Sequence, residues 1–164
     1  MVGFAHMLIA TDLTDRSERA LERAAQLGRE GRAERLTLLH VVAAGLPSIL
    51  ATQQKNAAEI FLATKIAQFP AVGVPTPASA IVRTGEPFST IVGEAISGKA
   101  DLVIVGVPSK SPYVQAIVGT TAERVIRFSE RPVLLVNQPT RGPYAGSSWL
   151  SRAPTGQCAV WRPL

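Results

Sequence analysis

Cysteine and histidine are nearly absent from this chain. Its 164 residues include one cysteine, Cys158, and two histidines, His6 and His40. A single cysteine excludes an internal disulfide framework, and these three residues are too few for a His/Cys zinc cluster. The sequence therefore predicts neither a disulfide-stabilised fold nor a metal site.

Long hydrophobic runs are absent too. No apolar stretch approaches the roughly 20 residues of a membrane-spanning helix. The N-terminal sequence MVGFAHMLIATDL lacks the basic leader and small-residue cleavage site of a signal peptide. A hydrophobic content of 46% with 18% charged residues is typical of one soluble domain with an ample core. We therefore expect a cytoplasmic protein that does not associate with membranes.

Acidic residues are missing from residues 139–164, which contain three arginines, four of the twelve prolines and both tryptophans, Trp149 and Trp161. Without this segment the formal charge falls from +5 to +2. A body whose positive and negative charges nearly cancel does not predict a surface that binds nucleic acid. We expect one domain at residues 1–138 and a flexible tail at 139–164. The alternative is that the tail docks through its tryptophans on a protein partner or on a second subunit.

Short apolar strands alternate with amphipathic helices along the body. Strands are predicted at 7–11, 36–42, 80–83, 102–105 and 133–136, and helices at 15–31, 48–69, 87–98 and after 120. Asp15 with Glu18 is expected to cap the first helix, Pro87 to open the third, and Gly98 to end it. In the third helix one buried face is predicted, comprising Phe88, Ile91, Val92, Ala95 and Ile96. The pattern predicts a doubly wound α/β fold, with a five-stranded parallel sheet sandwiched by helices.

Residues 102–137 carry most of the functional information. Gly106 opens a polar loop after a buried strand, and Gly119-Thr120-Thr121 closes that loop onto a helix. The start of a helix presents unpaired N–H groups and the positive end of the helix dipole, an arrangement that holds phosphate. Alternatively, Thr120 and Glu123 form a capping box, so that the Thr120 hydroxyl serves its own helix.

This segment resembles the universal stress protein family. ATP-binding members of that family carry glycine, two residues, glycine, nine residues, and then Gly-Ser or Gly-Thr. This chain has Gly106, two residues, Ser109, nine residues, and then Gly119-Thr120. The motifs ATDLTDRSERAL, RTGEPFSTIVGEA, ADLVIVG and GTTAERVIRFSERPVLLV extend the resemblance over residues 5 to 138.

The resemblance implies a Rossmann-like fold of the adenine nucleotide alpha hydrolase type, with strand order 3-2-1-4-5. Asp12, within Ala10-Thr11-Asp12, would then lie beside Gly106 and accept hydrogen bonds from a ribose, and Val41 would lie against adenine. The alternative for Asp12 is a local turn in which it binds backbone N–H groups. The implied ligand is ATP or AMP, with Mg²⁺ accompanying ATP, and the implied activity is regulation in stress rather than catalysis.

The loop departs from the ATP-binding pattern in three places. Ser109 replaces the second glycine, and Pro108 and Pro112 each remove an N–H donor. Lys110 and Ser111 offer a charge and a hydroxyl in exchange. The alternative function is therefore a nucleotide-free dimeric stress protein that acts through an unknown protein partner.

Three smaller features complete the predictions. Residues 93–100 match the spacing of a P-loop, but they lack its hydroxyl residue and precede a strand, so we interpret them as the end of a helix. His40 is expected at a hydrogen-bonded position at a strand end rather than as an acid or base. A homodimer is expected through Val133–Val136, the edge strand in the implied order.

Overall fold

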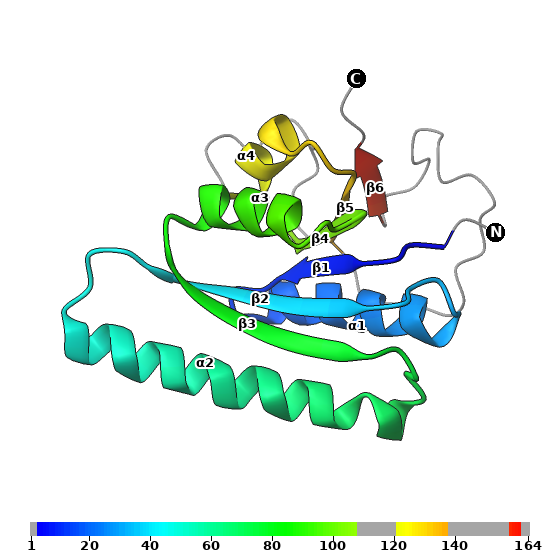
Figure 1. The fold of residues 1–164 in the computed structure, drawn as a ribbon, viewed down its shortest axis with the longest axis horizontal. Coiled ribbons are helices and arrows are strands. Elements are labelled where there is room, and N and C mark those ends of the chain that lie inside the picture. Colours follow the sequence, from blue (N-terminus) through cyan, green and yellow to red (C-terminus); the bar gives the residue numbers. More distant parts are fainter. Residues whose placement is uncertain (1–2, 108–120, 138–157, 162–164) are drawn as a thin grey trace.

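The computed structural model describes residues 3–107, 121–137 and 158–161. Its core is a six-stranded sheet in the order β3-β2-β1-β4-β5-β6 (Figure 1). The strands are β1 (Met7–Ala10), β2 (Leu36–Ala43), β3 (Ala78–Gly85), β4 (Leu102–Gly106), β5 (Val133–Val136) and β6 (Cys158–Trp161). The helices are α1 (Asp15–Arg29), α2 (Ser48–Gln68), α3 (Pro87–Ser97) and α4 (Thr121–Phe128), with a short 3₁₀ helix, η1 (Pro70–Val72).

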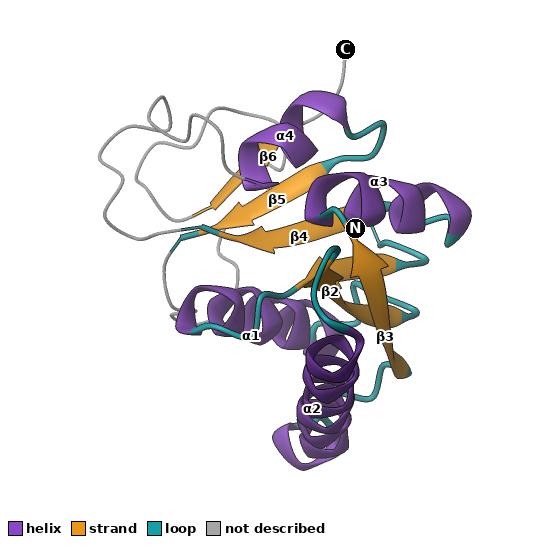
Figure 2. Cartoon of the chain, turned by 90° about the vertical axis from the view of Figure 1, so that its left-hand side faces the viewer, coloured by secondary structure: helices purple, strands orange, loops and turns teal. Residues whose placement is uncertain are grey.

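The first five strands are parallel and follow the order 3-2-1-4-5, which confirms the predicted doubly wound fold. Helices α1 and α2 cover one face of the sheet, and α3 and α4 cover the other (Figure 2). Strand β1 is buried on both faces: Met7 and Ile9 belong to the core beneath α1, and Leu8 and Ala10 to the core beneath α3. This double burial explains why its sequence is a continuous apolar run.

The sixth strand corrects the prediction for the C-terminal segment. Cys158–Trp161 pair antiparallel with β5, with Leu134 opposite Val160, so this part of the segment predicted to be a flexible tail belongs to the sheet. The expectation that Val133–Val136 form an open edge is therefore wrong, because β6 occupies that edge. A dimer through β5 would require β6 to leave.

The helix ends also differ in detail from the predictions. Thr14, not Asp15, is the residue that precedes α1, and its side chain makes no capping hydrogen bond. Pro87 opens α3 as predicted, and residues 93–98 form the end of this helix rather than a P-loop. Gly98 keeps a right-handed conformation, and Lys99 takes the left-handed one, with φ 53°. Ile96 was expected to be buried but is 42% exposed.

Gly98 is the C-cap residue that ends α3, as predicted, and it also has a packing role. A Cβ at this position would lie 2.8 Å from the Glu94 carbonyl oxygen and 3.4 Å from Cε1 of His6. The first distance is shorter than real carbon contacts allow, so only glycine fits between the helix end and the imidazole. No helix in the described part of the chain is both long and apolar enough to cross a bilayer.

His6 links the start of β1 to β2 and to the end of α3. Its Nε2 lies 2.7 Å from the Thr37 hydroxyl and its Nδ1 lies 2.9 Å from the Gly98 carbonyl. Nδ1 also lies 3.0 Å from Nη2 of Arg35, which donates to the same Gly98 carbonyl at 3.2 Å, so the imidazole, the guanidinium and the carbonyl form one polar cluster. Burial lowers the pKa of His6, and the nearby Arg35 guanidinium lowers it further, against the opposing effects of Gly98 and Asp101. The neutral ring is therefore the form that stabilises the fold.

We predict that acidification destabilises the protein partly through His6. The folded-state pKa lies below the ordinary value of 6.5, so this contribution is lost as the pH falls through 6.5 toward the lowered pKa. Urea unfolding at about pH 7.5 and about pH 5.5 should show the loss. His6→Gln should lose less on acidification, and should be about 1–3 kcal/mol less stable at the higher pH because buried partners are left poorly bonded. An identical pH dependence in both proteins would contradict the assignment.

A second prediction concerns the sheet edge. Removing residues 138–164 exposes the apolar strand β5, so the truncated chain should self-associate more than the full chain, as measured by light scattering. The self-association of Ala159→Pro can also be compared with that of Val160→Pro. Successive N–H groups of a strand point to opposite sides, so only one of these two substitutions removes an N–H donor that faces β5. An unchanged mass after truncation would show that the β5 edge does not self-pair.

Candidate functional site

A cavity of about 290 Å³ lies at the carboxyl ends of β1 and β4, where the winding direction of the sheet reverses. Ligands of doubly wound folds bind at such a reversal. Its walls come from β1, β2, β4 and the starts of α1, α3 and α4. The lining residues are Ala10, Thr11, Asp12, Arg16, Ser17, Leu39, His40, Val41, Pro87, Ile91, Val105, Gly106, Val107, Thr121 and Ala122.

Six of the nine predicted site residues line this one cavity. They are Ala10, Thr11, Asp12, Val41, Gly106 and Thr121. The other three, Ser109, Gly119 and Thr120, lie outside the described residues. The structure thus brings together predicted residues from four separate segments of the chain.

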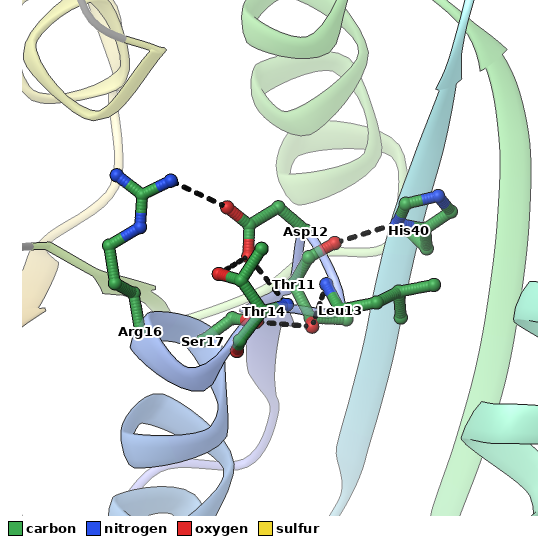
Figure 3. A network of polar contacts seen from close by, with 7 residues as sticks. All are labelled: Thr11, Asp12, Leu13, Thr14, Arg16, Ser17 and His40. Atoms are coloured by element: carbon green, nitrogen blue, oxygen red, sulfur yellow. Dashed lines mark hydrogen bonds and ion pairs between the residues drawn. The ribbon is translucent and has the colours of Figure 1, made fainter.

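The turn between β1 and α1 is unusual because Leu13 has a φ of 63°. A left-handed conformation costs a residue with a branched side chain on the order of 1–2 kcal/mol. Two bonds hold it: the Leu13 N–H donates to the Thr11 hydroxyl at 3.0 Å, and the Thr14 N–H donates to Asp12 Oδ1 at 3.0 Å (Figure 3). Leu13 also packs against the core beneath α1. Hydrogen bonds and the packing of the Leu13 side chain therefore both hold the turn in place.

The two oxygens of Asp12 have different surroundings. Oδ1 accepts from the Thr14 N–H and the Thr14 hydroxyl, which is the local turn considered for this residue. Oδ2 lies 3.4 Å from Nη2 of Arg16, and the Ser17 side chain also donates a hydrogen bond to the carboxylate. Burial raises the pKa of Asp12, but the bonds from Thr14 and Ser17 and the Arg16 charge outweigh it and lower the pKa below its ordinary value. The carboxylate is therefore ionised near neutral pH, with Oδ2 the oxygen open to a ligand.

The remaining walls divide into an apolar and a polar part. Leu39, Val41, Ile91 and Val105 supply flat hydrophobic surface suited to a ring. The starts of α1, α3 and α4 all border the cavity, so three helix dipoles present their positive ends to it. Sequence reasoning did not place Arg16 or Ile91 here, because their roles depend on how the helices pack over the sheet.

Gly106 is needed for packing as well as for any ligand. A Cβ on Gly106 would lie 2.2 Å from the carbonyl oxygen of Arg16 and 3.0 Å from Cα of Ser17. The first turn of α1 therefore rests directly on the backbone at the end of β4. This contact sets the separation of the two loops that border the cavity.

His40 fulfils the structural role expected of it. Its Nδ1 donates to the Thr11 carbonyl oxygen at 2.9 Å, linking the end of β2 to the end of β1 (Figure 3). Because the carbonyl only accepts, the proton is on Nδ1. The bond holds the segment that leads into Asp12.

A second cavity, of about 410 Å³, lies between α1 and α2 and is lined by Glu18, Gln26, Lys65 and Phe69 among others. Although it is larger, its polar groups bond to one another: Lys65 donates to Glu18, and Gln26 donates to Glu30. It also lies away from the carboxyl ends of the strands. In the described ranges, no three His, Cys, Asp or Glu side chains gather as metal ligands do.

The fold and the cavity define a doubly wound α/β protein with a cavity at its topological reversal. The sequence model of the universal stress protein family matches residues 3–137 of this chain. The chain belongs to this family.

Individual relatives agree with this assignment. Universal stress protein YxiE of Bacillus subtilis is 29% identical over 147 residues, which cover 81% of this chain and 99% of YxiE. The solved structure of universal stress protein UspA from Lactobacillus plantarum is similar in fold, with a TM-score of 0.70, 20% identity, and coverage of 84% of this chain and 100% of that one.

Two structural neighbours were solved with a nucleotide bound, one with cAMP and one with AMP. A universal stress protein family member from Arabidopsis thaliana, solved with AMP bound, covers 82% of this chain and 92% of its own, with 17% identity and a TM-score of 0.57. At this identity the likeness shows the fold alone.

We predict that Gly106→Ala disrupts the cavity from its backbone side. The added Cβ cannot coexist with the Arg16 carbonyl, so α1 must shift, at a cost of about 1–3 kcal/mol in unfolding free energy. Gly93→Ala is the matched control: no atom lies within 4 Å of its Cβ, and alanine stabilises a helix interior by about 0.5–1 kcal/mol. Thermal and urea unfolding should move in opposite directions for the two variants. Equal stability of Gly106→Ala and the parent would contradict the packing role.

Proposed function

We propose that this protein is an adenine-nucleotide-binding regulatory module of the cytoplasm, in which ATP or AMP occupies the cavity between β1 and β4. The observation that carries the proposal is the meeting of Asp12, Val41 and Gly106, from three separate elements, in one cavity. These residues combine a carboxylate acceptor, an apolar surface and a glycine at a loop start, as a nucleoside phosphate requires.

The chemistry of each wall supports this ligand. Asp12 Oδ2 suits a ribose, because an ionised carboxylate accepts from hydroxyl groups and makes strong charge-assisted bonds. Val41, with Leu39 and Ile91, offers the apolar contact that a purine ring needs. The bound AMP of the Arabidopsis relative supports the same ligand class.

For the phosphates, we propose the starts of the helices together with Ser109, Gly119, Thr120 and Thr121. Thr121 opens α4 and borders the cavity. Mg²⁺ would accompany ATP as a phosphate-bound ion, as in other sites where one or two carboxylates meet substrate phosphates. Asp12 is the one carboxylate among the described lining residues and is assigned to the ribose, so the phosphates themselves would hold the Mg²⁺.

A role in binding rather than catalysis is supported by how the titratable groups are used. His40 is engaged by the Thr11 carbonyl, and Asp12 Oδ1 is engaged by Thr14. Neither is arranged as an acid–base partner of the other. We propose that the occupied cavity changes a surface that an unidentified protein partner recognises. The alternative, a nucleotide-free dimer through β5, requires β6 to vacate its edge.

We predict that Asp12→Ala weakens ATP and AMP binding by about 10-fold to 100-fold, the loss expected for hydrogen bonds to a charged group. Isothermal titration calorimetry with ATP and Mg²⁺, and with AMP, measures this loss directly. Nucleotide released on denaturing the freshly purified protein would give independent support.

Glu34→Ala provides the control, because Glu34 is an exposed carboxylate that precedes β2 and does not line the cavity. It should leave the affinity within about 2-fold of the parent, as surface changes away from a site usually do. Absence of binding heat at millimolar nucleotide, with no nucleotide released on denaturation, would refute the proposed function.

A further inference from the structure

Arg16 is the one permanent cation among the described residues that line the cavity. It lies in the first turn of α1, and its guanidinium contacts Asp12 Oδ2 at 3.4 Å. The two side chains are 51% and 52% exposed. An ion pair with so long a distance and so much exposure contributes little to stability. It uses only one of the five N–H donors of the guanidinium.

Other arginines in the described ranges have shorter and more specific partners. Arg83 Nε lies 2.6 Å from Glu94, and Arg124 Nη1 lies 2.7 Å from Glu86 while its guanidinium covers the Phe88 ring at 4.3 Å. Arg19 donates to the Asn137 carbonyl at 3.1 Å. Each of these joins two elements, whereas Arg16 contacts the neighbouring turn and borders the cavity.

The position of Arg16 relates it to both halves of the site. Its own backbone carbonyl is the group on which Gly106 rests, so Arg16 stands where the connection from β4 to α4 begins. Its guanidinium rises from α1 and lies beside the Asp12 carboxylate, on the side of the view that also holds α4 (yellow, Figure 3). A ligand whose ribose is bound by Asp12 Oδ2 would bring the group on its 5′ carbon to the guanidinium.

We infer that Arg16 is a phosphate-binding residue, which holds the 5′-phosphate of a nucleotide whose ribose is bound by Asp12. This inference rests on the proposed function and assigns one side chain to ligand specificity. When the ligand enters, the ribose hydroxyls replace the guanidinium at Oδ2, and the guanidinium moves to a phosphate, to which it donates two parallel hydrogen bonds. The consequence is selectivity for nucleoside phosphates over nucleosides.

The test compares AMP with adenosine, because the two differ by the phosphate alone. In calorimetry on the full chain, the parent should bind AMP more tightly than adenosine. Arg16→Gln should weaken AMP binding by about 10-fold to 100-fold and leave adenosine within about 2-fold. Arg16→Lys should fall between, because it keeps the charge but loses the planar fork. Raising the salt concentration should reduce the difference between parent and Arg16→Gln.

Arg127→Gln is the matched control. Arg127 also forms an exposed ion pair four residues apart, 3.2 Å from Glu123, but does not line the cavity. It should change neither affinity.

Each contrary result has a distinct meaning. If the parent binds neither AMP nor adenosine, the proposed function and this inference both fail. If the parent binds AMP no better than adenosine, or if Arg16→Gln weakens both equally or matches Arg127→Gln, the role of Arg16 is overturned while nucleotide binding stands.

Discussion

The parallel pairing of β1 with β4 is the constraint on which the site depends. The register places Ala10 opposite Val105, so the residues that follow them, Thr11-Asp12 and Gly106-Val107, leave the sheet at the same level. The chain after β1 forms α1 on one face, and the chain after β4 reaches α4 on the other. Two connections that diverge from neighbouring strands leave a space between them, and that space is the cavity.

This space is narrow because α1 rests directly on Gly106. Loop glycines of this kind are easily interpreted as ligand contacts alone, yet here a side chain would collide with the Arg16 carbonyl whether or not a ligand is present. The packing contact also fixes where Arg16 and Asp12 stand relative to the end of β4. In the proposed function, packing and ligand recognition would therefore depend on the same glycine.

The sequence predicted the parallel sheet well because burial on both faces makes each inner strand a continuous apolar run, as in Met7–Ala10 and Leu102–Gly106. It failed for Cys158–Trp161, because the sequence of residues 139–164 shows no periodicity from which a strand could be predicted. For the site, Asp12, Val41 and Gly106 could be proposed from a family resemblance. Arg16 could not, because its place at the cavity arises from the contact between α1 and β4.

Asp12 illustrates why a local turn and a ligand site are not exclusive alternatives. The turn uses Oδ1, which Thr14 binds through two donors, and this bonding holds the carboxylate ionised and oriented. Oδ2 remains with a weak, solvent-exposed partner, so a ligand can displace Arg16 from it at little cost. In the proposed function, the strained turn at Leu13 would present a preoriented acceptor, so that the cost of ordering the carboxylate would be met in folding rather than in binding. A carboxylate free to rotate would lose that advantage, and the same residues would form a turn without forming a site.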